Sequence, residues 1–211
     1  MPLVIDSLVM GTFQSNCYVV RTAPDAQQAV VIDPGDEPSP LLRELDRLGT
    51  ATGAILVTHT DVDHIGGVAA LADSSGAEVW APLAEVDALR TGTTRGGYFT
   101  VAPHDPAHTV TGGDEITVAG ITFEVVDVPG HSHGHVAFFS GGELFAGDLL
   151  FAGSVGRVDL PGGDWETLLD SVRRLRERFP ADTVIHPGHG PATTLGDELQ
   201  TNPFLRELRA S

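Results

Sequence analysis

Four side chains that commonly bind metal ions lie within six residues of this sequence: His59, Asp61, Asp63 and His64. They directly follow residues 54–57, a short apolar run with the composition of a buried strand. Imidazole and carboxylate together suit zinc, iron or manganese, and a loop leaving a buried strand can hold such groups rigidly. The segment therefore predicts a metal-binding loop at the end of a strand.

Three other short motifs offer donors of the same kind. His131 lies in Pro-Gly-His, Asp148 in Ala-Gly-Asp and His189 in Pro-Gly-His-Gly, and each motif follows its own apolar run. Donor residues rarely recur at the ends of several strands by chance, so we expect these loops to converge. A site that holds two metal ions is the leading hypothesis.

The remaining pattern predicts the elements that would position these loops. Two strand-rich blocks, each followed by helices, indicate an αββα sandwich that forms a single domain over residues 1–211. Residues 90–114 have no clear pattern. The expected strands cover residues 3–10, 16–21, 29–32, 54–57, 78–80, 115–118, 121–128, 136–139, 144–146 and 183–185, and the expected helices cover residues 41–48, 66–72 and 165–179.

Composition restricts the classes of partner. The 211 residues suffice for one domain with a full core, and 12 basic residues, all of them arginine, stand against 29 acidic ones. The resulting net charge of −17 repels phosphate groups, so we expect neither nucleic acid nor a membrane as partner. Solubility, adaptation to high salt and bound divalent metals all remain open as reasons for this acidity.

Cysteine content and hydropathy bear on the compartment. Cys17 is the single cysteine, which fits a reducing environment without disulfides. No apolar run approaches the ~20 residues of a membrane span, and residues 1–6 lack the features of a secretory signal. We therefore expect a cytoplasmic protein, with its oligomeric state left open.

Further motifs, in order along the chain, resemble those of the metallo-β-lactamase-fold hydrolases, and most of all the glyoxalase II (hydroxyacylglutathione hydrolase) group of thioesterases. The resemblance covers nearly the whole chain and implies an α/β fold of metallo-β-lactamase type, with two mixed sheets inside and helices outside. The motifs that carry it are Asn16-Cys17-Tyr18, Ile32-Asp33-Pro34-Gly35 and residues 58–67, 129–135, 145–148, 153–157, 161–164, 187–194 and 202–204.

The resemblance also implies a role for each candidate ligand. It assigns one group of residues to a first metal, another group to a second metal and one carboxylate to both. Asp33 resembles the carboxylate that orients the ligand imidazoles, which need their free N–H held. The first group is His59, Asp61 and His131, the second is Asp63, His64 and His189, and the bridging residue is Asp148.

Position 61 departs from the family pattern, which usually has histidine there. Together with Asp63, Asp148 and a bridging hydroxide, Asp61 would bring two divalent metals close to electrical neutrality. This should raise the pKa of the bridging water and favour harder metals such as iron. Alternatively Asp61 does not ligate, and His59, His131 and Asp148 form an iron triad like that of the persulfide dioxygenases.

The activity that the resemblance implies is hydrolysis of a thioester, the S-acyl conjugate of a low-molecular-weight thiol. A hydroxide between two divalent metal ions would attack the carbonyl carbon, and Asp63 would orient it. Zinc is the first expectation, with iron or manganese as alternatives. Arg157 resembles the basic residue that meets the carboxylates of the small-molecule thiol conjugate. Only about twenty residues follow Pro191, too few for the usual glutathione-binding helices, so the thiol is open.

Three other functions remain open on the sequence: a single-iron persulfide dioxygenase, a lactonase, and a weakly active scaffold or sensor. A lactonase would use the same hydroxide on an ester ring. A scaffold would follow if Asp61 had disabled the site. Residues 187–190 and 202–204 resemble the hydrolase branch, in which His189 serves a second metal, and so disfavour the dioxygenase.

Overall fold

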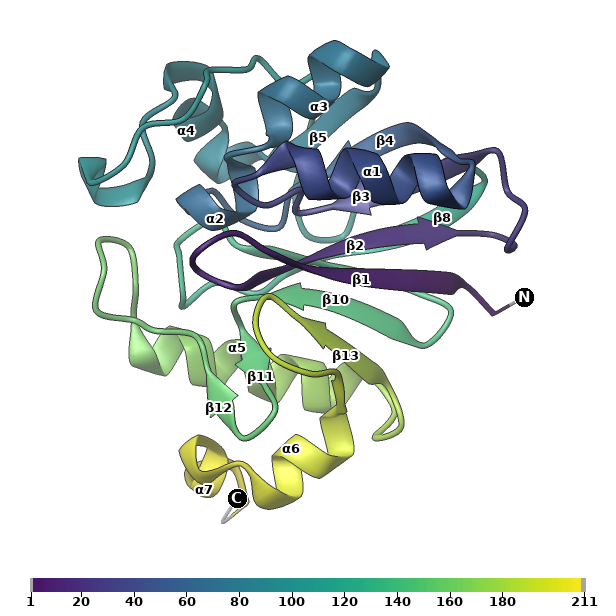
Figure 1. Cartoon of the computed structure of the whole chain (residues 1–211). Coiled ribbons are helices and arrows are strands. Elements are labelled where there is room, and N and C mark those ends of the chain that lie inside the picture. Colours follow the sequence, from purple (N-terminus) through teal and green to yellow (C-terminus); the bar gives the residue numbers. More distant parts are fainter. Residues whose placement is uncertain (1, 210–211) are drawn as a thin grey trace.

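Two mixed β-sheets packed face to face form the centre of the computed structural model, which describes residues 2–209 (Figure 1). Helices α1 and α3 lie on the outer side of one sheet, and α5 lies on the outer side of the other (Figure 1). The predicted αββα sandwich is therefore confirmed.

The first sheet has six strands in the order β1-β2-β3-β4-β5-β6. Its first three strands run antiparallel, whereas β3 to β6 run parallel, so the loops after β3 and β4 leave from the same edge. The strands are β1 (Val4–Met10), β2 (Ser15–Arg21), β3 (Gln28–Ile32), β4 (Ala51–Leu56), β5 (Glu78–Pro82) and β6 (His108–Val110), and the accompanying helices are α1 (Pro38–Leu48), α2 (Val62–Ile65), α3 (Val68–Ser75) and α4 (Val86–Thr91), with 3₁₀ turns η1 (Leu83–Glu85) and η2 (Arg95–Gly97).

The second sheet also has six strands, in the order β14-β13-β10-β9-β8-β7. Strands β10 and β13 are parallel, and β8 points the same way because β9 is antiparallel to both β8 and β10. Its elements are β7 (Glu115–Val118), β8 (Ile121–Asp127), β9 (Val136–Ser140), β10 (Glu143–Gly147), α5 (Trp165–Arg178), β13 (Val184–Pro187), β14 (Thr193–Thr194), α6 (Leu195–Thr201), η3 (Pro203–Leu205) and α7 (Arg206–Arg209), with a separate hairpin of β11 (Leu150–Phe151) and β12 (Ser154–Val155).

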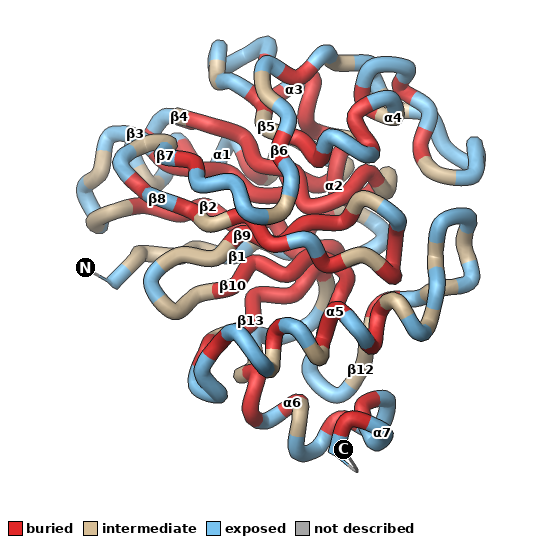
Figure 2. The backbone as a smooth tube through the Cα atoms, turned by 180° about the vertical axis from the view of Figure 1, so that it is seen from behind, coloured by how far each residue is buried: buried red, intermediate tan, exposed pale blue. Residues whose placement is uncertain are grey.

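Three apolar layers hold these elements together. Leu56 of β4 meets Phe123, Phe138 and Phe145 of the second sheet in the layer between the sheets. One outer layer packs α1 and α3 on the first sheet, and the other packs α5 on the second. The central strands are accordingly buried along much of their length (Figure 2). Each fully buried Leu or Phe contributes about 1.5–3 kcal/mol, so these layers fix the strand ends where the functional loops begin.

Local signals set the ends of the helices. Pro38 and Pro40 lie in the first turn of α1, where a missing N–H costs nothing, and Gly49 ends that helix with φ of 64°. Helix α5 begins after Asp164, whose carboxylate accepts a hydrogen bond from the Thr167 N–H at 2.8 Å. Both helices match the predicted ranges closely.

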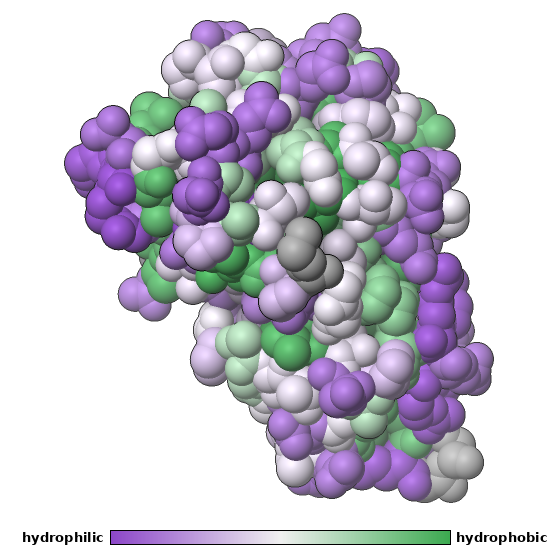
Figure 3. Space-filling view, turned by 90° about the vertical axis from the view of Figure 1, so that its right-hand side faces the viewer, coloured by the Kyte–Doolittle hydropathy of each residue, from purple (hydrophilic) through white to green (hydrophobic). Residues whose placement is uncertain are grey.

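The surface combines polar cover with a few exposed apolar groups. Hydrophilic side chains cover much of the face on the right of Figure 1, and apolar ones are interspersed among them (Figure 3). Phe13, Tyr98 and Phe99 are exposed large hydrophobic residues that lie at the opposite end of the molecule, around the metal-binding loops. No helix within residues 2–209 is long and apolar enough to cross a membrane.

Candidate metal centre

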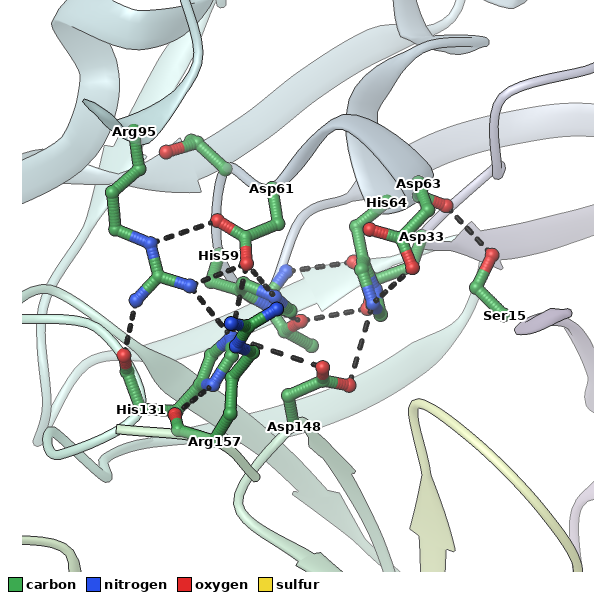
Figure 4. Close-up of polar contacts among 12 residues, drawn as sticks. Ser15, Asp33, His59, Asp61, Asp63, His64, Arg95, His131, Asp148 and Arg157 are labelled. Atoms are coloured by element: carbon green, nitrogen blue, oxygen red, sulfur yellow. Dashed lines mark hydrogen bonds and ion pairs between the residues drawn. The ribbon is translucent and has the colours of Figure 1, made fainter. Parts of the chain in front are cut away.

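The predicted metal-binding motifs converge because of strand direction. Strands β3 and β4 end at one edge of the first sheet, and β8, β10 and β13 end at one edge of the second. Packed face to face, the two sheets bring these edges together. Residues of the loop 58–64, His131 and Asp148 therefore meet although they are far apart in the sequence (Figure 4). His189 joins them through contacts with Asp63 and Asp148.

The first donor group consists of His59, Asp61 and His131, whose candidate ligand atoms all lie within 4.8 Å of one another. The Asp61 Oδ2 atom is 3.1 Å from His131 Nε2 and 3.9 Å from His59 Nε2. His131 is held in place by its Nδ1–H, which donates to the Arg157 carbonyl at 2.8 Å. Its Nε2 atom then faces Asp61, Asp148 and the guanidinium of Arg95.

The second donor group consists of Asp63, His64 and His189. The Asp63 Oδ2 atom is 3.2 Å from His189 Nε2 and 3.7 Å from His64 Nε2. Asp63 and His64 belong to the single turn of α2, and the Ser15 hydroxyl fixes this turn by donating to the Asp63 carbonyl at 2.7 Å.

Asp148 lies between the two groups. Its Oδ2 atom is 3.7 Å from His131 Nε2 and 3.5 Å from His189 Nε2, and its Oδ1 atom is 3.4 Å from His64 Nε2. One carboxylate thus faces imidazoles of both donor groups, as a ligand shared by two metal ions would.

The donors fit divalent metal ions by a second criterion, the lack of other partners. His59 Nε2, His64 Nε2 and Asp148 Oδ1 are buried and have no hydrogen-bond partner among the described residues. Buried polar atoms are normally paired, so unpaired atoms that point into one space indicate a missing cation or water. Nitrogen and carboxylate oxygen donors in this number suit zinc or iron.

Asp33 orients two of the imidazoles, as the resemblance implies. Its Oδ2 atom accepts from His64 Nδ1 at 2.9 Å and from the Thr58 hydroxyl at 2.6 Å, and its Oδ1 atom accepts from the Thr58 N–H at 2.8 Å. The Thr58 hydroxyl is in turn 3.0 Å from His59 Nδ1. A proton on His64 Nδ1 leaves Nε2 free to ligate, so Asp33 selects the useful tautomer.

Gly188, in the Pro-Gly-His motif of His189, has a steric reason: it lies against Asp148. A Cβ atom at position 188 would fall 2.0 Å from Asp148 Oδ1. Asn16 and Tyr18 of β2 hold the same loop by donating to the Pro187 carbonyl at 2.9 and 2.6 Å. The motif around Asn16 therefore connects the first sheet to the ligand loop of the second.

Electrostatic coupling shifts the pKa values of the donors. Burial lowers the pKa of His59 well below 6.5, and His64, His135 and His131 lower it further. Burial alone would lower the pKa of His64, but Asp148 and Asp33 raise it well above 6.5. Burial also opposes the charge of His189, but hydrogen bonds to Asp148 and Asp63 raise its pKa to about 10. Without metal, the second group therefore carries protons that a cation must displace.

Asp61 has a partner that the sequence did not predict. The Arg95 guanidinium pairs with both carboxylate oxygens, through Nε to Oδ1 at 3.0 Å and through Nη2 to Oδ2. The expectation that Asp61 leaves the centre less positive is therefore incomplete, because Arg95 adds the charge that Asp61 removes. Burial would raise the pKa of Asp61, but His131 and Arg95 together lower it.

Arg157 lies at the rim of the site with its guanidinium paired to Asp159 through two contacts of 2.7 Å. Its side chain is 60% exposed, so this ion pair is weak and exchangeable. Its backbone carbonyl, by contrast, holds His131. Substrate binding by Arg157 stays a prediction.

A cavity of about 450 Å³ opens directly over the metal-binding residues. Its walls combine aromatic and aliphatic side chains with the charged donors. Phe13 and Phe99 meet edge to face with ring centroids 5.9 Å apart. The residues that line it are Phe13, Asp61, Val62, Asp63, Thr94, Arg95, Tyr98, Phe99, His131, Asp148, Arg157, Leu160 and His189.

Glu85 is a second residue that the sequence did not single out. It is buried, and its Oε2 atom accepts from the N–H and the hydroxyl of Thr60, each at 2.9 Å. Its Oε1 atom accepts from the Gly134 N–H at 2.9 Å. Glu85 therefore ties the first metal-binding loop to the loop of His131.

Comparison with known proteins supports the predicted resemblance. Residues 10–189 match the metallo-beta-lactamase superfamily. Hydroxyacylglutathione hydrolase GloC of Haemophilus influenzae is 33% identical over 208 residues, which cover 95% of this chain and 97% of that protein. A di-iron-bound form of TTHA1623 is 41% identical, with a TM-score of 0.78 over 95% of this chain and 100% of that one. The BLEG-1 B3 metallo-beta-lactamase is 35% identical, with a TM-score of 0.89 over 96% and 100% of the two chains. The chain therefore belongs to the metallo-β-lactamase superfamily.

Proposed function

We propose that the protein is a metal-dependent hydrolase that cleaves acyl thioesters, the S-acyl conjugates of small thiols. The observation that carries this proposal is the position of Asp148, whose carboxylate lies within 3.4 to 3.7 Å of imidazoles from both donor groups. The name of the relative GloC, a hydroxyacylglutathione hydrolase, supports a thioester as the substrate.

Two divalent cations, when bound, would lower the pKa of water and polarise a carbonyl oxygen. His59, Asp61 and His131 would hold the first, Asp63, His64 and His189 the second, and Asp148 both. Asp63 also lines the cavity, so its carboxylate can orient the attacking water and accept its proton. The thiolate that leaves needs little protonation, which fits the lack of an obvious general acid among the described residues that line the cavity.

The cavity walls suggest how the substrate binds. Phe13, Tyr98, Phe99 and Leu160 form an apolar wall that would contact the acyl group or the carbon chain of the thiol. Arg157 at the rim can exchange Asp159 for a substrate carboxylate, because an exposed ion pair is worth only about 0–1 kcal/mol.

A single-iron persulfide dioxygenase needs only the first donor group with Asp148. The second donor group disfavours this activity. Its His189 Nε2 atom is 3.2 Å from Asp63 and 3.5 Å from Asp148, so it lies in the same site as the first donor group. A group without a cation to bind would leave His64 Nε2 buried and unpaired.

The proposal is tested with protein purified without added metal. We expect close to two metal equivalents per chain and release of free thiol from S-lactoylglutathione or a related acyl thioester. Chelation should abolish this release and metal addition should restore it. Oxygen consumption with glutathione persulfide, or hydrolysis of a lactone or a β-lactam alone, would replace the proposal with one of the other activities. Full metal loading without any turnover would favour a scaffold.

A further inference from the structure

Arg95 is unusual among the basic residues because its guanidinium is almost buried at the metal centre. Its side chain is 8% exposed, and it lies on the 3₁₀ turn η2 of the segment that had no clear sequence pattern. It donates to both oxygens of Asp61 and to the His131 carbonyl, and its Nη2 atom is 3.0 Å from His131 Nε2. Figure 4 shows the Arg95 guanidinium beside the Asp61 carboxylate.

Asp61 does not cap the helix that follows it, although it stands at the capping position. It occupies the N-cap position of α2, where an aspartate normally accepts a hydrogen bond from the first turn of the helix. Its side chain makes no such capping bond. The carboxylate instead faces Arg95 with both oxygens, and its Oδ2 atom also faces the imidazoles of His59 and His131.

Charge explains why the two residues occur together. An aspartate in the first donor group adds a unit of negative charge that a neutral imidazole would not add. The guanidinium at 3.0 Å adds a unit of positive charge that cannot be titrated away at ordinary pH. The pair is therefore neutral overall, and Oδ2, which accepts from Arg95 Nη2, has a second lone pair for a cation beside His59 and His131.

We propose that Arg95 is the charge partner of Asp61 in the metal centre, a positioning residue that acts through this carboxylate. The pair presents the first cation with an oxygen donor and with the net charge of a neutral ligand. Arg95 thereby limits the affinity for the first cation and keeps the remaining positive charge that activates water. The inference rests on the proposed metal centre, but cation affinity is measured without substrate.

The test compares variants by titrating metal-free protein with Zn²⁺ against a chromophoric chelator. Arg95→Gln removes the positive charge beside Asp61. The Zn²⁺ affinity of the first donor group, which we expect to be the weaker of the two, should rise about tenfold because an unbalanced carboxylate attracts the cation more strongly. The substitution should also move the acidic limb of the pH–rate profile upward. Arg95→Lys keeps the charge but cannot form both contacts with Asp61, so its Zn²⁺ affinity should lie between those of the wild type and Arg95→Gln.

Asp61→His provides the opposite perturbation. With Arg95 still present, the imidazole leaves a nearly buried guanidinium without its carboxylate. The Zn²⁺ ion at the first donor group should then bind about tenfold more weakly. The double variant Asp61→His with Arg95→Gln should return to near the wild-type affinity. This reversal of sign separates a charge partner from a residue that merely packs. The matched control is Arg90→Gln, which removes an arginine that is 47% exposed and paired with Asp105 in the same segment.

Three results would overturn the inference. One is an unchanged Zn²⁺ affinity in Arg95→Gln, as in Arg90→Gln. Another is a Zn²⁺ affinity at the first donor group that is equally weak in Asp61→His and in the double variant Asp61→His with Arg95→Gln. The third is one Zn²⁺ equivalent in the wild type and two in Arg95→Gln, since Arg95 would then occupy the position of the first cation. Failure of the wild type to bind any Zn²⁺ would instead refute the metal centre itself.

Discussion

Replacing Asp33 by asparagine keeps the size of the side chain but removes its charge and one acceptor. The backbone tolerates the change, because φ at this position is +50° and asparagine adopts the left-handed region about as readily as aspartate. Any effect therefore reports on the hydrogen bonds of the carboxylate. These come from the Thr58 N–H at 2.8 Å, the Thr58 hydroxyl at 2.6 Å and His64 Nδ1 at 2.9 Å.

The asparagine oxygen can accept the Thr58 N–H, but the amide nitrogen then faces His64 Nδ1. Two N–H donors cannot face each other, so His64 must move its proton to Nε2. That atom faces Asp63 and Asp148 and must be unprotonated to bind a cation. Loss of such an orienting partner weakens metal binding by about 10–100-fold. Loss of one charge-assisted hydrogen bond also destabilises the metal-free fold by about 1.5–3 kcal/mol.

The assay is a Zn²⁺ titration of metal-free protein, together with denaturant unfolding of the same samples. We expect one weakened equivalent in Asp33→Asn and two unchanged equivalents in Asp46→Asn, which alters an exposed residue of α1. If Asp33→Asn binds both equivalents within about twofold of the wild type, the assignment of a tautomer-selecting role to Asp33 is wrong.

Three other predictions concern the second donor group and the cavity. The pKa of His189 is raised to about 10 in the folded protein, so protonated His189 stabilises the metal-free fold below pH ~6.5 and this contribution is lost as the pH rises towards 10. Urea unfolding of metal-free protein should therefore show a lower free energy of unfolding at pH 10 than at pH 6. The difference between the two pH values should be smaller in His189→Gln. Gly188→Ala places a Cβ atom 2.0 Å from Asp148 Oδ1, so metal analysis should find less than one equivalent in a folded protein. The control Gly76→Ala should keep both equivalents, because its Cβ meets nothing within 4 Å and the strain from φ of +71° is confined to the end of α3. Phe99→Ser shortens the apolar wall of the cavity, so KM for a long-chain acyl thioester should rise about tenfold while KM for a short-chain one changes little, and equal changes would show that this wall does not bind the acyl group.

Much of the site could be predicted because its donors follow strong local patterns. His59, Asp63 and His64 come directly after an apolar strand, and His131 and His189 stand in Pro-Gly-His motifs after two others. Strand direction then brings the loops together without further information from the sequence. The same reasoning predicted β1, β2, β3, β5 and α5 to within about two residues at each end, because apolar residues mark them clearly. Strand β4 begins three residues earlier than predicted, at Ala51, because residues 51–53 have no large apolar side chain.

Short elements escaped prediction because few residues carry their pattern. Strand β6 has three residues and helix α4 has six, and they lie in or beside the region 90–114 that is rich in glycine, threonine and proline. The helix expected over residues 66–72 is α3, which begins at Val68, and the short helix α2 (Val62–Ile65) before it was not predicted. Helix α2 carries the candidate ligands Asp63 and His64, but its single turn is too short to give a helical pattern.

Arg95 escaped for a different reason. It is 34 residues from Asp61 and 36 from His131, and no periodicity or motif connects these positions. A charge balance at the metal centre can be inferred from Asp61, but the residue that supplies it depends on how the segment after α4 folds back. An aspartate in place of the usual histidine in the first donor group was the signal that a nearby positive charge should be sought.

The most direct test of the metal centre is anomalous X-ray scattering at the zinc edge from crystals grown with Zn²⁺. We predict two separate peaks, one among His59, Asp61 and His131 and one among Asp63, His64 and His189, with Asp148 beside both. Peaks confined to other parts of the surface, with these side chains directed away from one another, would contradict the account.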